Sequence, residues 1–160
     1  MKLIATAVFL AAVFVQPSVA AEQPAKSPLL GAWSVDVTRL PMAPAARPRS
    51  VTITFSAAPS NSLRTLVQVV DPGGNRLEAD GVTPLDGAPT AVQSSFEADI
   101  SATTMPRPEV LIMQLGKNGI PASTRIYTVN ADEESMIETV AYFTADGKPV
   151  LRRNHFTRIR

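Results

Sequence analysis

Residues able to perform acid-base, nucleophilic or metal chemistry are sparse in this sequence. Histidine occurs once, at His155, and cysteine does not occur at all. A single histidine excludes two-histidine metal sites and zinc-protease helices, and any serine triad would have to use it. No Gly-x-Ser-x-Gly elbow occurs. We interpret His155 as a structural or surface residue, and we predict no catalytic residue, no metal site, no cofactor and no enzyme activity.

Acidic and glycine-rich segments are equally uninformative about catalysis. The run Asp132, Glu133 and Glu134 has neither the spacing of a calcium loop nor the separation of an acid-base pair, and it is typical of a solvated turn. Gly73 and Gly74 follow Asp71-Pro72, which is a hairpin signal and not a phosphate loop leading into a helix.

Arginines at the chain's end are the remaining candidates for recognition of a ligand. Side chains alternate along a strand, so Arg152, Asn154, Phe156 and Arg158 share one face. If this face points inward, the Arg152 guanidinium is available to a ligand carboxylate, which it matches with two hydrogen bonds. The alternative, which we favour, is that these arginines are solvated or paired with an acid on the neighbouring strand, for example Glu138.

The amino terminus has the layout of a secretory signal peptide. Met1-Lys2 precedes an apolar run from Leu3 to Val15, and small residues follow up to Ala20. This run is shorter than the roughly 20 residues that a membrane-spanning helix needs. We predict a signal peptide over 1–20, cleaved after Ala20 or, as the near alternative, after Ala21. The mature protein would then be periplasmic or extracellular, without stable insertion in a membrane.

The length and charge of the remaining chain predict one uncharged domain. Of the 15 basic and 14 acidic residues, Lys2 is lost with the signal peptide, which leaves 14 of each. This balance argues against nucleic acid as a partner, because phosphate backbones require a concentrated basic surface. Residues 21–29 read as a flexible leader and residues 30–160 as a single domain. A protein partner is not identifiable from the sequence.

Short runs of β-branched and aromatic residues, separated by turn signals, predict an all-β antiparallel meander. Alternation is clearest where Val51, Ile53 and Phe55 alternate with polar residues. Three proline-rich stretches, 41–48, 84–89 and 106–108, are predicted to be loops because proline lacks the ladder donor. The predicted strands are 31–38, 49–56, 62–70, 76–82, 92–100, 109–116, 122–130, 135–144 and 149–158. A meander of this length usually closes to remove its edges, which predicts a barrel of about eight or nine strands.

The segment Leu30-Gly31-Ala32-Trp33-Ser34-Val35-Asp36 resembles the Gly-x-Trp opening of lipocalins, fatty-acid-binding proteins and small exported bacterial lipocalin-like domains of the calycin type. The end of the chain, from His155 to Arg160, is similar to the last strand of those proteins. The resemblance implies that an arginine of the last strand packs over the tryptophan and closes one end of the barrel. Gly31, Trp33 and Arg158 are the matching residues here, with Arg152 and Arg153 as alternatives to Arg158 because the sequence does not specify the register.

These observations lead to two functional hypotheses. The first is an exported, non-enzymatic protein that holds a small, mostly apolar or amphipathic ligand, with or without an acidic head, inside a β-barrel. The second is a structural or interaction domain with a filled core, which acts through its outer surface or proline-rich loops on an envelope or secreted partner. The candidate lining residues would serve either a cavity or a solid core: they are Val51, Ile53, Phe55, Val67, Val69, Ile112, Ile126, Met136, Val140 and Tyr142, together with Arg152.

Overall fold

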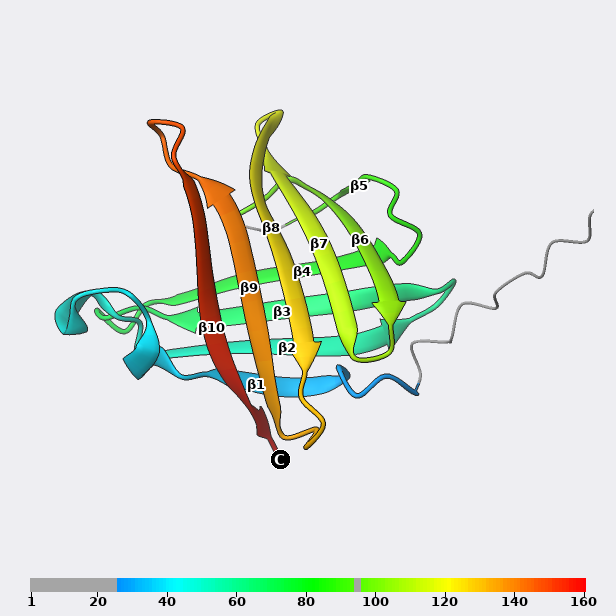
Figure 1. Cartoon of the computed structure of the whole chain (residues 1–160), viewed down its shortest axis with the longest axis horizontal. Helices are drawn as coiled ribbons and strands as arrows, with labels where there is room; N and C mark the ends of the chain where they lie inside the picture. The colour runs from blue at the N-terminus through cyan, green and yellow to red at the C-terminus, as the bar shows by residue number, and fades with distance from the viewer. Residues whose placement is uncertain (1–25, 94–95) are drawn as a thin grey trace, which may run out of the picture.

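The computed structural model describes residues 26–93 and 96–160, and these residues form an almost entirely β structure (Figure 1). The predicted signal peptide and residues 21–25 of the predicted leader lie outside the described residues. The strands are β1 (Gly31–Val35), β2 (Ser50–Ala58), β3 (Ser62–Val70), β4 (Arg76–Pro84), β5 (Thr90–Ala91), β6 (Ile100–Arg107), β7 (Val110–Lys117), β8 (Ile120–Val129), β9 (Ser135–Phe143) and β10 (Pro149–Ile159). Two short 3-10 helices, η2 (Val37–Arg39) and η3 (Pro44–Ala46), follow β1.

All ten strands belong to one antiparallel sheet with the order β4-β3-β2-β1-β10-β9-β8-β7-β6-β5. The first and last strands therefore pair, with Trp33 opposite Arg158, as the all-β meander prediction requires. Figure 1 shows β1–β4 crossing behind β6–β10, so that the sheet wraps around an interior. Strands β4 and β6 do not form a continuous ladder, and they are joined near one end by the Asp86–Thr104 bridge and a 3.1 Å hydrogen bond between the Thr83 and Thr103 hydroxyls. The barrel is nearly closed.

Local sequence explains the strand and turn pattern. In β2, Ile53 and Phe55 are buried, while Thr52 and Thr54 on the other face are more exposed. Such alternation places one face of a strand against the interior. The β3–β4 turn uses the Asp71 carboxylate, which accepts hydrogen bonds from the backbone and side-chain nitrogens of Asn75, each at 2.8 Å. Gly74 adopts a φ of +95° in this turn, a backbone conformation that residues other than glycine rarely adopt.

A cluster of buried apolar residues holds the segment that leads into β1. Leu29, Trp33 and Leu111 are fully buried there. The Tyr127 ring packs edge-on against Phe55 and Phe156, with ring centroids 5.2 and 6.3 Å apart, and so joins β8 to β2 and β10 across the interior. Within the described part of the chain, no helix is long and apolar enough to cross a membrane.

The predicted strand over 92–100 is wrong. The strand begins at Ile100 and continues to Arg107, while 92–93 and 96–99 are not in strands and 94–95 lie outside the described residues. The prediction that 106–108 is wholly a loop is wrong for the same reason, because Pro106 and Arg107 are the last residues of β6. The register between β6 and β7 shifts between Thr104 and Arg107. Proline is tolerated at such an irregularity, where no ladder donor is required.

Two further expectations at the amino-terminal side need correction. The first strand ends at Val35, because Asp36 caps a 3-10 turn by accepting a hydrogen bond from the Thr38 backbone nitrogen. The last residues of the predicted leader are packed and not free, since Ser27 and Leu29 are buried. The Leu29 carbonyl accepts a 2.9 Å hydrogen bond from the Trp33 indole nitrogen, which ties this segment to the core.

Candidate ligand-binding site

The barrel interior contains a cavity of about 340 Å³ that is open to solvent on one side, close to the lower limit of small-molecule sites. Apolar side chains of β1, β2 and β3 form one part of its wall, and the segment that carries η2 and η3 forms another. Polar side chains from β8, β9 and β10 lie at one side. The lining residues are Val35, Leu40, Met42, Ala46, Pro48, Val51, Ile53, Val67, Val69, Asp71, Pro72, Phe96, Glu97, Arg125, Tyr127, Glu138, Arg152, Asn154 and Phe156.

Arg125 is the centre of the polar side of the cavity. Its Nη1 lies 2.9 Å from Oε1 of Glu138, and its Nη2 lies 2.7 Å from Oε2 of Glu97. Asn154 donates from Nδ2 to the second oxygen of Glu138 at 2.5 Å. Neighbouring strands β8, β9 and β10 thus contribute Arg125, Glu138 and Asn154 to one network. Glu97 reaches the network from the connection between β5 and β6.

Burial and charge both act on the two ionisable β8 side chains. Burial raises the pKa of the Tyr127 phenol well above its usual value, and the negative charge of Glu138 raises it further. Burial alone would lower the pKa of Arg125, but Tyr127, Glu97 and Glu138 together more than offset this effect and raise it. Tyr127 is therefore neutral and Arg125 charged at physiological pH.

Arg152 is a second arginine at this site, and its environment differs from that of Arg125. Its guanidinium carbon lies 5.9 Å from the centroid of the Tyr142 ring. Its Nε is buried and has no hydrogen-bond partner among the described residues, and the same holds for Oδ1 of Asn154. Both atoms are closed off from solvent and from the cavity, so a ligand in the cavity would not reach them in this arrangement.

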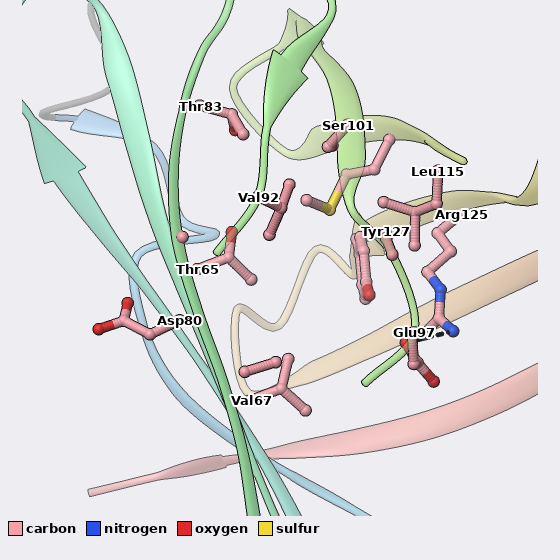
Figure 2. A pocket seen from close by; sticks show the side chains of 14 residues that line it. Thr65, Val67, Asp80, Thr83, Val92, Glu97, Ser101, Leu115, Arg125 and Tyr127 are labelled. Carbon is pink, nitrogen blue, oxygen red and sulfur yellow. Dashed lines mark ion pairs between the residues drawn. The ribbon is translucent and has the colours of Figure 1, made fainter. Parts of the chain in front are cut away.

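Two further spaces adjoin the cavity. One, of about 350 Å³, is lined by Glu97, Ala122, Ser123, Arg125, Val140, Tyr142 and Arg152. The other, of about 60 Å³, lies towards β4 and β6 and is drawn in Figure 2. Figure 2 shows Tyr127 and the Arg125–Glu97 ion pair on one side of it, Thr65 and Val67 on the other, and Asp80 pointing away. Glu97 and Arg125 line all three spaces, so the ion pair lies where they meet.

The candidate lining residues are distributed over three environments. Val51, Ile53, Val67 and Val69 line the 340 Å³ cavity, Val140 and Tyr142 line the 350 Å³ space, and Arg152 lines both. Phe55 and Met136 are packed in the core, almost without exposure. The interpretation that Arg152 pairs with Glu138 is wrong, because Glu138 binds Arg125 and Asn154 instead.

Ile112 and Ile126 were predicted to line the interior, and this prediction is wrong. On β7 the buried positions are Leu111, Met113 and Leu115, so Ile112 lies on the opposite face. It is paired with Ile126, which alternates in the same way with buried Tyr127. The sequence is ambiguous here because apolar residues occupy both faces of these strands.

The residues assigned to barrel closure lie together where the chain enters β1. The guanidinium carbon of Arg158 is 4.1 Å from the Trp33 ring centroid, and the same side chain donates to the carbonyls of Pro28, Leu30 and Glu133. Gly31 has a φ of +119°, and a Cβ there would be 2.8 Å from the Arg158 guanidinium. The register sets Arg158 opposite Trp33, while Arg152 faces the cavity and Arg153 is exposed.

Sequence reasoning missed Glu97, Arg125, Tyr127 and Asn154 as site residues. Arg125 and Tyr127 share a parity on one predicted strand, which is a signal that two polar-tipped side chains face the same way. The sequence gives no such indication for Glu97, because this residue lies between β5 and β6 and belongs to no strand whose alternation would orient it. Within 26–93 and 96–160, no group of three or more histidine or acidic side chains is placed to hold a metal ion.

Comparison with known proteins identifies the fold of this chain but not its family. No family model and no curated protein sequence matches the chain. Among solved structures, a Schistosoma mansoni fatty acid binding protein in complex with arachidonic acid is similar, with a TM-score of 0.54 and 14% sequence identity. The match covers 84% of this chain and 98% of that protein. At this identity the similarity shows the fold alone: an all-β, calycin-like antiparallel barrel.

Proposed function

We propose that this chain is an exported, lipocalin-like carrier that holds a small, mostly apolar molecule inside its barrel and performs no chemistry on it. The observation that supports this proposal most directly is a hollow of about 340 Å³ on the inner side of the barrel wall. It is lined by apolar side chains of β1, β2 and β3 and by the charged side chains of Asp71, Glu97, Arg125, Glu138 and Arg152. The solved structure of similar fold is a fatty acid binding protein, which is consistent with carriage of an apolar ligand.

The proposal that the protein is exported is supported by residues 1–20, which have the layout of a signal peptide. The ligand would enter between β4 and β6, because this side of the barrel wall lacks continuous backbone pairing. The unpaired stretch lies beside the smaller space of Figure 2.

Native mass spectrometry of the protein expressed with its own amino terminus tests export and carriage together. We expect a chain that begins at Ala21 and a second species heavier by the mass of one bound small molecule, which is lost at higher collision energy. A full-length chain starting at Met1 would contradict export. A bare mass after gentle ionisation, together with no displacement of an apolar fluorescent probe by any lipid, would contradict carriage.

A pair of matched variants ties binding to the interior. Val67 lines the cavity, whereas Val82 lies on the outer face of β4 and is 50% exposed. Val67→Phe should fill part of the cavity and weaken binding of an apolar fluorescent probe by about tenfold or more, while Val82→Phe should leave it within about twofold. Equal affinities of the two variants would place the ligand outside the barrel.

A further inference from the structure

Two hairpins carry the most exposed large apolar side chains of the described residues. Ile120 at the start of β8 is 67% exposed, and Phe143 at the end of β9 and Leu151 on β10 are 72% and 76% exposed. We call these three residues the apolar anchors. Figure 1 shows the β7–β8 and β9–β10 turns projecting at the same edge of the molecule. Between them lies a hollow of about 330 Å³ that has no charged residue in its lining. Grouped exposed apolar side chains are typical of an interaction surface.

A basic residue accompanies each apolar anchor. Lys117 is paired with Ile120 across the β7–β8 hairpin. Lys148 lies in the β9–β10 turn, where its side chain is 78% exposed and forms an ion pair with Asp146 at 2.7 Å. Arg153 is exposed on the outward face of β10, two positions after the last anchor. The apolar surface is therefore bordered by positive charge.

Negative charge is scarce on the strands that carry these turns. Glu138 is the single acidic residue of β6–β10, and its inward side chain is 3% exposed. Asp99, which precedes β6, accepts a 2.7 Å hydrogen bond from the backbone nitrogen of Asn118 in the β7–β8 turn. The outer face of β4, by contrast, carries Glu78 and Asp80. The outer surface of β6–β10 is thus the side of the barrel that favours an anionic partner.

A phospholipid membrane fits this combination better than a protein does. Lysine is depleted at the centres of protein interfaces, whereas here lysines lie beside the apolar anchors. Two copies that met through this surface would bring like charges together. At a membrane, long basic side chains keep their charge among the lipid phosphates while neighbouring apolar side chains enter the headgroup layer. Two projecting turns can also meet one flat surface at the same time.

We propose that the protein docks peripherally on anionic phospholipid membranes through the β7–β8 and β9–β10 turns. The apolar anchors enter the headgroup layer, and Lys117, Lys148 and Arg153 contact lipid phosphates. No strand crosses the bilayer. None of these residues lines the 340 Å³ cavity, so docking and ligand carriage are separate properties with separate tests.

Co-sedimentation of the exported chain with vesicles of equimolar phosphatidylglycerol and phosphatidylcholine tests the apolar contact. Phe143→Ser combined with Leu151→Ser should weaken binding about tenfold or more, because two apolar side chains no longer leave water. Leu77→Ser combined with Val82→Ser is the matched control, since these side chains are 45% and 50% exposed but lie on β4. The control should stay within about twofold of the wild type. No wild-type binding to these vesicles, or equal losses in the two variants, would overturn the proposal.

A second pair of variants tests the lipid charge. Lys148→Gln combined with Arg153→Gln should weaken binding to the same vesicles about tenfold or more, because each basic side chain near an anionic surface adds attraction. Arg76→Gln combined with Arg160→Gln removes the same charge from β4 and from the carboxyl terminus, which lies at the opposite edge in Figure 1. This control should stay within about threefold. Equal losses in the two pairs, or equal wild-type binding to pure phosphatidylcholine, would overturn the anionic docking surface.

Sedimentation equilibrium without lipid distinguishes a membrane from a second copy as the occupant. We expect the same molecular mass for the wild type and for the variant that combines Phe143→Ser with Leu151→Ser. Self-association that this variant abolishes, together with no binding to vesicles, would assign the surface to a second copy and overturn membrane docking.

Discussion

At the scale of single residues, Arg158 joins parts of the chain that are far apart in sequence. Its guanidinium lies over Trp33 and donates to the carbonyls of Pro28 and Leu30, more than 120 positions earlier. Cation–π contact and hydrogen bonds from a charged donor each contribute about 1–2 kcal/mol in such settings. Arg160, two residues later, makes an exposed ion pair with Glu134.

We therefore predict that Arg158→Ala lowers the free energy of unfolding by about 2 kcal/mol or more, whereas Arg160→Ala leaves it nearly unchanged. Urea denaturation followed by tryptophan fluorescence measures both, since Trp33 is the single tryptophan. Comparable losses in the two variants would remove the closure role from Arg158.

At the scale of elements, β7 shows how strongly the interior depends on register. Leu111 is fully buried, while the adjacent Ile112 lies on the outer face against Ile126. A slip of one residue would exchange the two faces along the whole strand. Stability should thus differ sharply between substitutions at neighbouring positions of similar hydrophobicity.

Leu111→Ala should cost about 2–5 kcal/mol of unfolding free energy, the range for truncation of a buried leucine. Ile112→Ala should cost about 1 kcal/mol, because less surface is buried there. Thermal or chemical denaturation of the two variants checks this order. If Ile112→Ala proved the more damaging change, the assignment of faces on β7 would be wrong.

At the scale of the whole molecule, Tyr127 couples the interior to global stability. Its ring contacts Phe55 and Phe156 across the barrel, and burial together with the Glu138 charge keeps its pKa well above the usual value. Below about pH 10, both the folded and the unfolded state keep the phenolic proton. Above this pH, only the unfolded state releases it, so the folded state loses stability as the pH rises.

Unfolding free energy should consequently fall above about pH 10, by up to about 1.4 kcal/mol for each pH unit from this group. Tyr127→Phe should flatten this alkaline decline, and Tyr142→Phe, at the open space next to Arg152, serves as the control. Urea titrations at several pH values, with tyrosinate absorbance as a second signal, measure the effect. The explanation fails if Tyr127 ionises while the protein remains folded.

Several features followed from the sequence alone because their causes are local or periodic. Alternation in residues 51–55 and the Asp71–Asn75 turn specify strands and reversals through side-chain direction and backbone conformation. The pairing of the first and last strands was also predictable, since a long meander removes its edges by closing.

Only the tertiary structure decided which side chains face the cavity and with what partners. Both faces of β7 and β8 are apolar, so periodicity does not choose between Leu111 and Ile112, and closure of the barrel makes that choice. Glu97 lies between β5 and β6, far from Arg125 in sequence, and no local pattern in the sequence indicates their ion pair. The binding chemistry therefore depends on contacts between residues distant in sequence, which arise from register and closure and not from any segment alone.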